Sequence, residues 1–164
     1  MMQDLSGLFL TRDGKWLHDG QDIRHRRLSL LLHQSICRTE DGALHVSTGL
    51  DSLPFQCEDA PYQILTLDRQ NNTLRGRLSD QSDFQLPHEH TIWIDDAGRM
   101  RTPVKENQFW ALLSRSATQS LYDRLTPTSD PTCFHIVDTN VSVKEAAVSY
   151  IWADKPPVPS PASK

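Results

Sequence analysis

Residues 7–17, with the sequence GLFLTRDGKWL, place an Asp-Gly pair between two apolar segments. This pattern is typical of a β-hairpin, because glycine readily adopts the positive φ that a tight turn requires. Downstream, leucines recur at helical spacing and predict a helix over Arg24–Arg38 with Asp22 as its N-cap. Short alternating segments at Leu44–Val46 and Phe55–Glu58 predict strands. The first part of the chain is therefore expected to form a hairpin, a helix and further strands.

The second half of the sequence shows the same order. Residues 91–101, TIWIDDAGRMR, again place an acidic-Gly turn between apolar segments. A stripe of apolar residues predicts a helix over Gln108–Leu125, with Asn107 as its N-cap, and strands are expected at Cys133–Val137 and Val148–Trp152. The two halves are offset by about 82 residues. An internal repeat of this kind is typical of a duplicated supersecondary unit.

Between the halves, two alternating segments flank Asn71-Asn72 and predict a further hairpin, Tyr62–Asp68 with Thr73–Ser79. We therefore predict an α+β protein with two small related domains, residues 1–85 and 86–153. Each domain is expected to hold a mainly antiparallel sheet and one principal helix.

The last residues, 154–164, contain four prolines, which remove backbone donors and favour extended chain. We expect a disordered tail, which is either inert or a ligand for a proline-recognition domain.

Composition narrows the function classes. The 164 residues are 37% hydrophobic and 23% charged, and the formal net charge of −4 lacks the basic excess typical of nucleic-acid binding. No apolar stretch approaches the ~18 residues of a membrane span, and the N-terminus has no signal-peptide pattern. The three widely spaced cysteines predict neither a disulfide framework nor a zinc site. We expect a cytoplasmic protein.

Several segments resemble a bacterial family known as domain of unknown function 1285 (DUF1285). They are Gly14–Gly20, the most specific segment Glu58–Tyr62, and Ala111–Arg115. Two positions depart from the family pattern: Asp22 stands where a proline is usual, and His25 where an arginine is expected. The second half is the more diverged.

The resemblance implies two related domains, the second similar to a pleckstrin-homology fold. It also implies a ligand cleft between them, a nucleotide-like ligand and a role in signalling. It supplies no catalytic residues.

The first predicted helix begins with the basic residues Arg24, His25, Arg26 and Arg27. A helix N-terminus carries partial positive charge, so basic residues there are favoured where an anion binds. Arg24, His25 and Arg26 are therefore candidate ligand-binding residues. The alternative is a solvated basic face balanced by neighbouring carboxylates.

Four further residues, Glu58, Asp59, Arg115 and Tyr122, are candidates for contact with a ligand. Glu58 and Asp59 either stabilise a turn before Pro61 or face the interdomain cleft and accept from a ligand. Arg115, on the helix face that also carries Tyr122, either clamps a phosphate or carboxylate or pairs at the surface.

Metal and nucleophile patterns are weak. His88-Glu89-His90 has no third ligand nearby, so we interpret these residues as solvated side chains at a strand start. Cys57 has no base beside it and alternates with Phe55, which favours a buried apolar role. We assign no catalytic residue and no metal ligand, and the sequence identifies no cofactor.

Three function classes follow. The first is a non-catalytic sensor or adaptor that binds an anionic, nucleotide-like ligand between its domains. The second is a protein-interaction module with a protein partner. The third is an enzyme acting on phosphoesters, with Glu58 or Asp59 as base.

Overall fold

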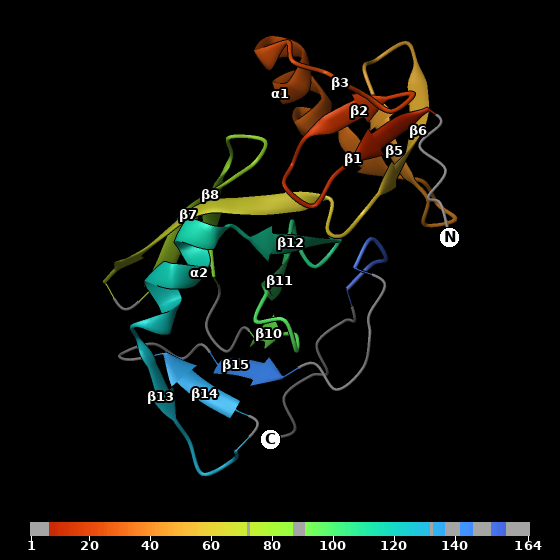
Figure 1. Ribbon diagram of the computed structural model, residues 1–164. Coiled ribbons are helices and arrows are strands. Elements are labelled where there is room, and N and C mark those ends of the chain that lie inside the picture. Colours follow the sequence, from red (N-terminus) through yellow and green to blue (C-terminus); the bar gives the residue numbers. More distant parts are fainter. Residues whose placement is uncertain are drawn as a thin grey trace.

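The computed structural model describes residues 7–71, 73–86, 91–131, 133–136, 142–145 and 152–156. These residues form two sheets and two helices, which confirms the predicted α+β class with two sheets. Figure 1 shows the first sheet with α1 above the second sheet with α2.

The first sheet contains six strands in the order β3-β2-β1-β6-β5-β4, and α1 spans Arg26–Gln34. Its strands are β1 Leu8–Leu10, β2 Trp16–His18, β3 Gln21–Asp22, β4 Ile36–Arg38, β5 Leu44–Ser47 and β6 Ser52–Cys57.

The second sheet contains nine strands in the order β13-β14-β15-β10-β11-β12-β7-β8-β9, and α2 spans Arg115–Tyr122. Its strands are β7 Tyr62–Gln70, β8 Thr73–Leu78, β9 Asp83–Gln85, β10 Thr91–Ile94, β11 Met100–Val104, β12 Phe109–Leu113, β13 Leu125–Pro127, β14 Cys133–Ile136 and β15 Ser142–Glu145.

The strand order of the first sheet recurs within the second. The order β3-β2-β1-β6-β5-β4 corresponds, strand for strand, to β12-β11-β10-β15-β14-β13. In both units the two central strands pair in parallel, β1 with β6 and β10 with β15, and the other neighbours pair antiparallel. Each helix follows the third strand of its unit. The second unit differs because β7, β8 and β9 extend its sheet beyond β12.

The repeat extends to individual hydrogen bonds in the hairpin turns. The amide of Gly14 donates to the carbonyl of Thr11, and that of Gly98 donates to Asp95, each at 3.0 Å. Both glycines have positive φ, +82° and +80°, which L side chains rarely adopt. The Asp-Gly pattern therefore predicted the first hairpin correctly, and the second hairpin is also confirmed.

Both helices are shorter than the sequence predicted. α1 begins after His25, whose Nδ1 accepts from the Leu28 amide at 3.2 Å, so the predicted N-cap Asp22 is wrong. Residues Ile36–Arg38 leave the helix to form β4, because they pair with β5.

The predicted helix Gln108–Leu125 is wrong over its first part. Phe109–Leu113 form β12, which lies between β11 and β7 and is buried along its whole length. A continuous apolar segment suits a strand buried on both faces as well as a buried helix, so periodicity alone does not separate the two. The helix begins only after Ser114, whose Oγ accepts from the Ala117 amide at 3.1 Å.

Other strand predictions have mixed outcomes. The hairpin of β7 and β8 is confirmed. The predicted strand Val148–Trp152 lies outside the described residues except for Trp152, as does the tail beyond Pro156. The chain passes from the first sheet to the second between Cys57 and Tyr62. The domain boundary after residue 85 stays a prediction.

One hydrophobic core connects the two sheets, since residues of both contact one another in a single cluster. Trp16 is fully buried and meets the rings of His33 and Phe55 at centroid distances of 5.5 and 5.0 Å. Burial of each large apolar side chain stabilises the fold by about 1.5–3 kcal/mol. His33, on α1, is a buried titratable side chain that lies against the first hairpin.

The position of His33 predicts a pH dependence of stability. Burial lowers the pKa of His33 below its ordinary value of 6.5, and this effect outweighs the Gly14 backbone and the Asp80 carboxylate, which favour the charged ring. Below pH 6.5 the unfolded chain therefore binds a proton that the folded chain binds more weakly, and stability falls as the pH drops.

We expect the free energy of unfolding of His33→Gln to depend less on pH than that of the wild type between pH 7 and pH 5. Urea titrations across this range measure the difference. His18→Gln, at an exposed histidine, serves as the control. An unchanged slope in His33→Gln would contradict the prediction.

Candidate functional site

A buried ion pair joins the segment between the sheets to the second sheet. Asp59 lies between β6 and β7, and Arg101 lies on β11. Their side chains are 3% and 2% exposed. The guanidinium of Arg101 donates to both carboxylate oxygens, from Nε to Oδ1 at 2.8 Å and from Nη2 to Oδ2 at 2.6 Å. Such bidentate geometry is the strongest form of this interaction.

Two hairpin turns are attached to this pair. Arg101 Nη1 donates to Asp95 Oδ2 at 2.8 Å in the β10–β11 turn. Arg12 Nε, in the β1–β2 turn, donates to Asp59 Oδ2 at 3.1 Å, and the Arg12 amide donates to a Glu58 carboxylate oxygen at 2.7 Å. One buried carboxylate therefore contacts a turn of the first sheet and a strand of the second.

Burial and charge have opposing effects on this cluster. Burial by itself lowers the pKa of Arg101, but the hydrogen bonds that it donates to Asp59 and Asp95 outweigh burial and raise the pKa above its ordinary value. For Asp95, burial raises the pKa, and the hydrogen bonds from Arg101 and from the Arg99 amide bring it below its ordinary value. Arg101 and Asp95 therefore both favour their charged forms. The ring of Trp152 covers the Arg101 guanidinium at 4.2 Å.

A pocket of about 390 Å³ lies beside this cluster, at the N-terminus of α2. We call it the α2 pocket. Both hairpin turns, β7, the end of β12 and α2 contribute to its lining. The lining residues are Arg12, Asp13, Gln63, Gly98, Arg99, Leu112, Leu113, Ser114, Arg115, Thr118, Gln119 and Tyr122.

The lining of the α2 pocket is cationic, with three arginines and one aspartate, although the chain as a whole is acidic. Arg12 is held by Asp59, and Arg99 lies 4.0 Å from Asp95. Arg115 is exposed, and the structure gives it no hydrogen bond or ion pair with another described residue. Arg115 is therefore available to an incoming anion.

Backbone groups add to this preference for negative charge. The first turn of α2 contains no acidic residue, and the first amides of a helix have no partner within it. Together with the helix dipole, such amides favour an anion. The side chains of Gln63, Thr118 and Gln119 supply neutral donors and acceptors around the same space.

The structure brings two of the sequence-predicted residues into the α2 pocket, Arg115 and Tyr122. The Tyr122 hydroxyl donates to the Gly98 carbonyl at 3.2 Å and so contacts the β10–β11 turn. Glu58 and Asp59 do not line the pocket. Both contact Arg12, which is one of its lining residues. Direct contact of these two carboxylates with a ligand stays a prediction.

The other predicted residues lie elsewhere. Arg24, His25 and Arg26 are exposed at the start of α1 and are not in the lining of the α2 pocket. Arg24 approaches Asp22 at 3.9 Å, and His25 caps the helix. Their binding of an anion stays a prediction.

Sequence reasoning missed Arg12 and Arg99, which line the pocket, and Arg101, which supports it. Arg12 precedes the Asp13-Gly14 turn and Arg99 follows Gly98. Neither position gave a signal in the sequence, because only the folded chain brings the two turns together beside α2.

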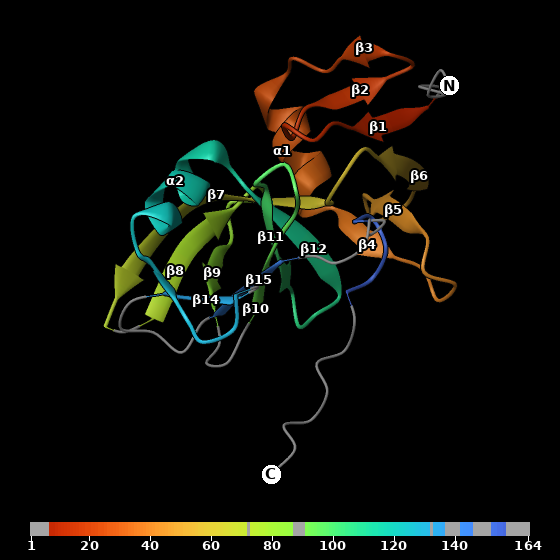
Figure 2. The same ribbon diagram turned by 60° about the horizontal axis from the view of Figure 1, so that its bottom comes forward.

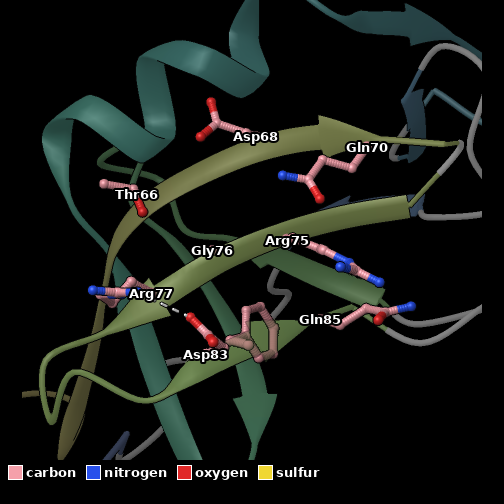
Figure 3. Close-up of a pocket in the computed structure, with 9 residues that line it drawn as sticks. Thr66, Asp68, Gln70, Arg75, Gly76, Arg77, Asp83 and Gln85 are labelled. Carbon is pink, nitrogen blue, oxygen red and sulfur yellow. Dashed lines mark hydrogen bonds and ion pairs between the residues drawn. The ribbon is translucent and has the colours of Figure 1, made fainter.

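A second, larger pocket of about 720 Å³ lies over β7, β8 and β9 (Figure 3). Its charges balance: Asp68 and Asp83 oppose Arg75 and Arg77, and Arg77 pairs with Asp83 at 3.3 Å. This surface therefore has less preference for an anion than the α2 pocket, and we do not assign a ligand to it.

Other classes of site have less support. Within the described ranges, no group of three or more His, Cys, Asp or Glu residues is placed to hold a metal ion. The predicted pair His88 and His90 lies outside those ranges. Burial raises the pKa of the Cys57 thiol to about 12, which keeps it protonated. Of the helices in the described part of the chain, none has the length and apolar character needed to cross a membrane.

Comparison with known proteins supports the resemblance inferred from the sequence. Neither a protein-family model nor a curated protein matches this chain. A DUF1285 family protein from Silicibacter pomeroyi DSS-3 has a similar structure, with a TM-score of 0.67 and 17% identity over 85% of this chain and 79% of that one. A DUF1285 family protein from Shewanella baltica OS155 has a TM-score of 0.55 and 17% identity, over 74% and 94%.

These similarities show that the chain has the fold of DUF1285 family proteins, as the sequence predicted. The pleckstrin-homology-like character of residues 86–153 stays a prediction.

The buried ion pair predicts a large effect of Asp59→Asn on stability. The substitution leaves Arg101 buried without a full counter-charge, and breaking a buried pair in this way costs about 3–5 kcal/mol. Chemical denaturation measures the loss. In the control, Asp83→Asn, the exposed ion pair with Arg77 is lost, and only the small effect of a surface pair is expected. Equal stability of the two variants would contradict the prediction.

Proposed function

We propose that this chain is a non-catalytic sensor or adaptor that binds an anionic small molecule in the α2 pocket, with a role in signalling. The main support for the proposal is the position of Arg115 at the N-terminus of α2. Arg115 has no hydrogen bond or ion pair with another described residue, and Arg12 and Arg99 line the same pocket. Guanidinium forks and helix amides together suit a phosphate or carboxylate.

The rest of the lining favours a ligand with an uncharged part. Tyr122 offers an aromatic ring, and Gln63 and Gln119 offer amides that can donate and accept. A ligand that places a phosphate at the arginines and a polar ring near Tyr122 is nucleotide-like. A pocket of about 390 Å³ falls within the usual range for small-molecule sites.

The proposal of binding without catalysis rests on the chemistry of the lining. Among the described residues, the lining holds neither a histidine nor a cysteine, and its carboxylate is that of Asp13. Asp59, a candidate base in the enzyme hypothesis, has its oxygens occupied by Arg101 and Arg12. These contacts favour a structural role for Asp59 over proton transfer.

Replacing Arg115 tests the proposal. Thermal shift and calorimetry are carried out with pyrophosphate, a nucleoside monophosphate and a nucleoside diphosphate at low salt. A ligand at ~100 times its dissociation constant stabilises the protein by ~2.7 kcal/mol. Loss of one charge-assisted hydrogen bond costs ~1.5–3 kcal/mol, so Arg115→Ala should bind roughly 10- to 100-fold more weakly.

The matched control is Arg75→Ala, an exposed arginine in the charge-balanced pocket over β8, which should bind like the wild type. The double variant Arg24→Ala with Arg26→Ala separately tests the anion site predicted at α1. Wild-type protein that none of the three probes stabilises, or an Arg115→Ala variant with unchanged affinity, would refute binding at the α2 pocket.

A further inference from the structure

The two repeated units differ in what lies beside their third strand. In the second unit, β12 pairs in parallel with β7, and α2 packs over β7. Ala117 is 1% exposed on this side of the helix. Ser114 Oγ donates to the Leu65 carbonyl at 3.0 Å, and Ser120 Oγ donates to the Leu67 carbonyl at 3.1 Å. One face of α2 is therefore covered by an added strand.

In the first unit, no strand of the described residues occupies the equivalent place. β3 is the end of the six-stranded sheet and lies outermost in Figure 2, and α1 follows it in the chain. Ser29 Oγ donates to the Ile23 carbonyl at 3.1 Å, which attaches α1 to the residue after β3. Among the described residues, nothing extends this sheet beyond β3.

The helices can be aligned by their N-caps, His25 and Ser114, since both side chains accept from the amide three residues later. In this alignment Leu28 corresponds to Ala117, and Leu31 corresponds to Ser120. Leu28 is 42% exposed and Leu31 is 47% exposed. The helix positions that contact β7 in the second unit thus carry exposed leucines in the first.

We propose that β3 and the Leu28–Leu31 face of α1 form a docking site for an extended segment of a partner protein. The segment adds to the first sheet as a strand parallel to β3, as β7 adds to β12. Backbone pairing then holds the segment at the sheet edge, and its apolar side chains cover the two leucines. This is strand addition, a known mode of peptide recognition.

The charges of α1 define the partner further. Arg26 and Arg27 are exposed in the first turn of the helix, which contains no acidic residue. In the cap alignment Arg26 corresponds to Arg115, which lines the α2 pocket together with Gln63 of β7, and Gln63 pairs with Leu112 of β12. By the same geometry, the residue of the docked segment at the Gln63 position lies toward Arg26. We therefore expect a segment of alternating apolar residues with an acidic residue in the part that pairs with β3.

A second copy of the chain fits this site less well. Two copies related by a two-fold axis through β3 would pair their β3 strands antiparallel, whereas the repeat indicates a parallel partner. The proline-rich residues 154–164 are also poor candidates, since proline donates no hydrogen bond to a ladder. A segment of another protein remains as the occupant.

The probe is a labelled synthetic peptide that copies Tyr62–Asp68 of β7 with glutamate in place of Gln63. Its binding to the full chain is measured by fluorescence anisotropy, and its location by amide chemical shifts. We expect saturable binding below about 1 mM, with shifts concentrated in β3 and α1. Leu31→Glu should weaken binding roughly 10- to 100-fold, because a buried leucine contact is lost.

The control variant is Leu50→Glu, since Leu50 is fully exposed in the β5–β6 turn, away from α1. It should bind the peptide like the wild type. Peptide that does not bind at 1 mM, shifts that fall on β12 and α2 instead, or equal affinities of Leu31→Glu and Leu50→Glu would each overturn the proposal. Self-association of the chain that Leu31→Glu abolishes would instead identify a second copy as the occupant and would also overturn it.

Discussion

The buried pair of Asp59 and Arg101 is the interaction on which the rest of this structure depends. Two charges removed from water are stable only when they are paired and hydrogen-bonded. Asp59 lies where the chain passes from the first sheet to the second, and its oxygens accept from Arg101 on β11 and Arg12 in the β1–β2 turn. Satisfying this one carboxylate therefore sets the positions of both hairpin turns.

The α2 pocket is a consequence of that constraint. Because Arg12 is held by Asp59 and the β10–β11 turn is held through Asp95, the two turns meet beside the N-terminus of α2. The Gln63 side chain completes the contact by donating to the Arg12 carbonyl from β7. The buried charges thus support a surface site without lining it, which separates the residues that maintain the fold from those that face a ligand.

The internal repeat shows how one unit can present two different surfaces. Equivalent turns, helix caps and strand orders recur in both halves, yet only the second unit has β7, β8 and β9 beside its third strand. In that unit the helix face carries Ala117 and Ser120, which fit closely against β7. In the first unit the same positions carry Leu28 and Leu31, which are exposed. The proposed ligand site and the proposed docking site belong to different units and use different parts of the repeat.

The sequence by itself determined the features that depend on neighbouring residues: the turns at Gly14 and Gly98, which need positive φ, the hairpin of β7 and β8, and the apolar faces of α1 and α2. Only the tertiary structure decided which strand lies beside β12, and hence that Phe109–Leu113 is a strand. It also decided that Asp59 pairs with Arg101 and that Arg12 and Arg99 join Arg115. These outcomes depend on contacts between residues that are far apart in the chain, for which local propensity and spacing carry no signal.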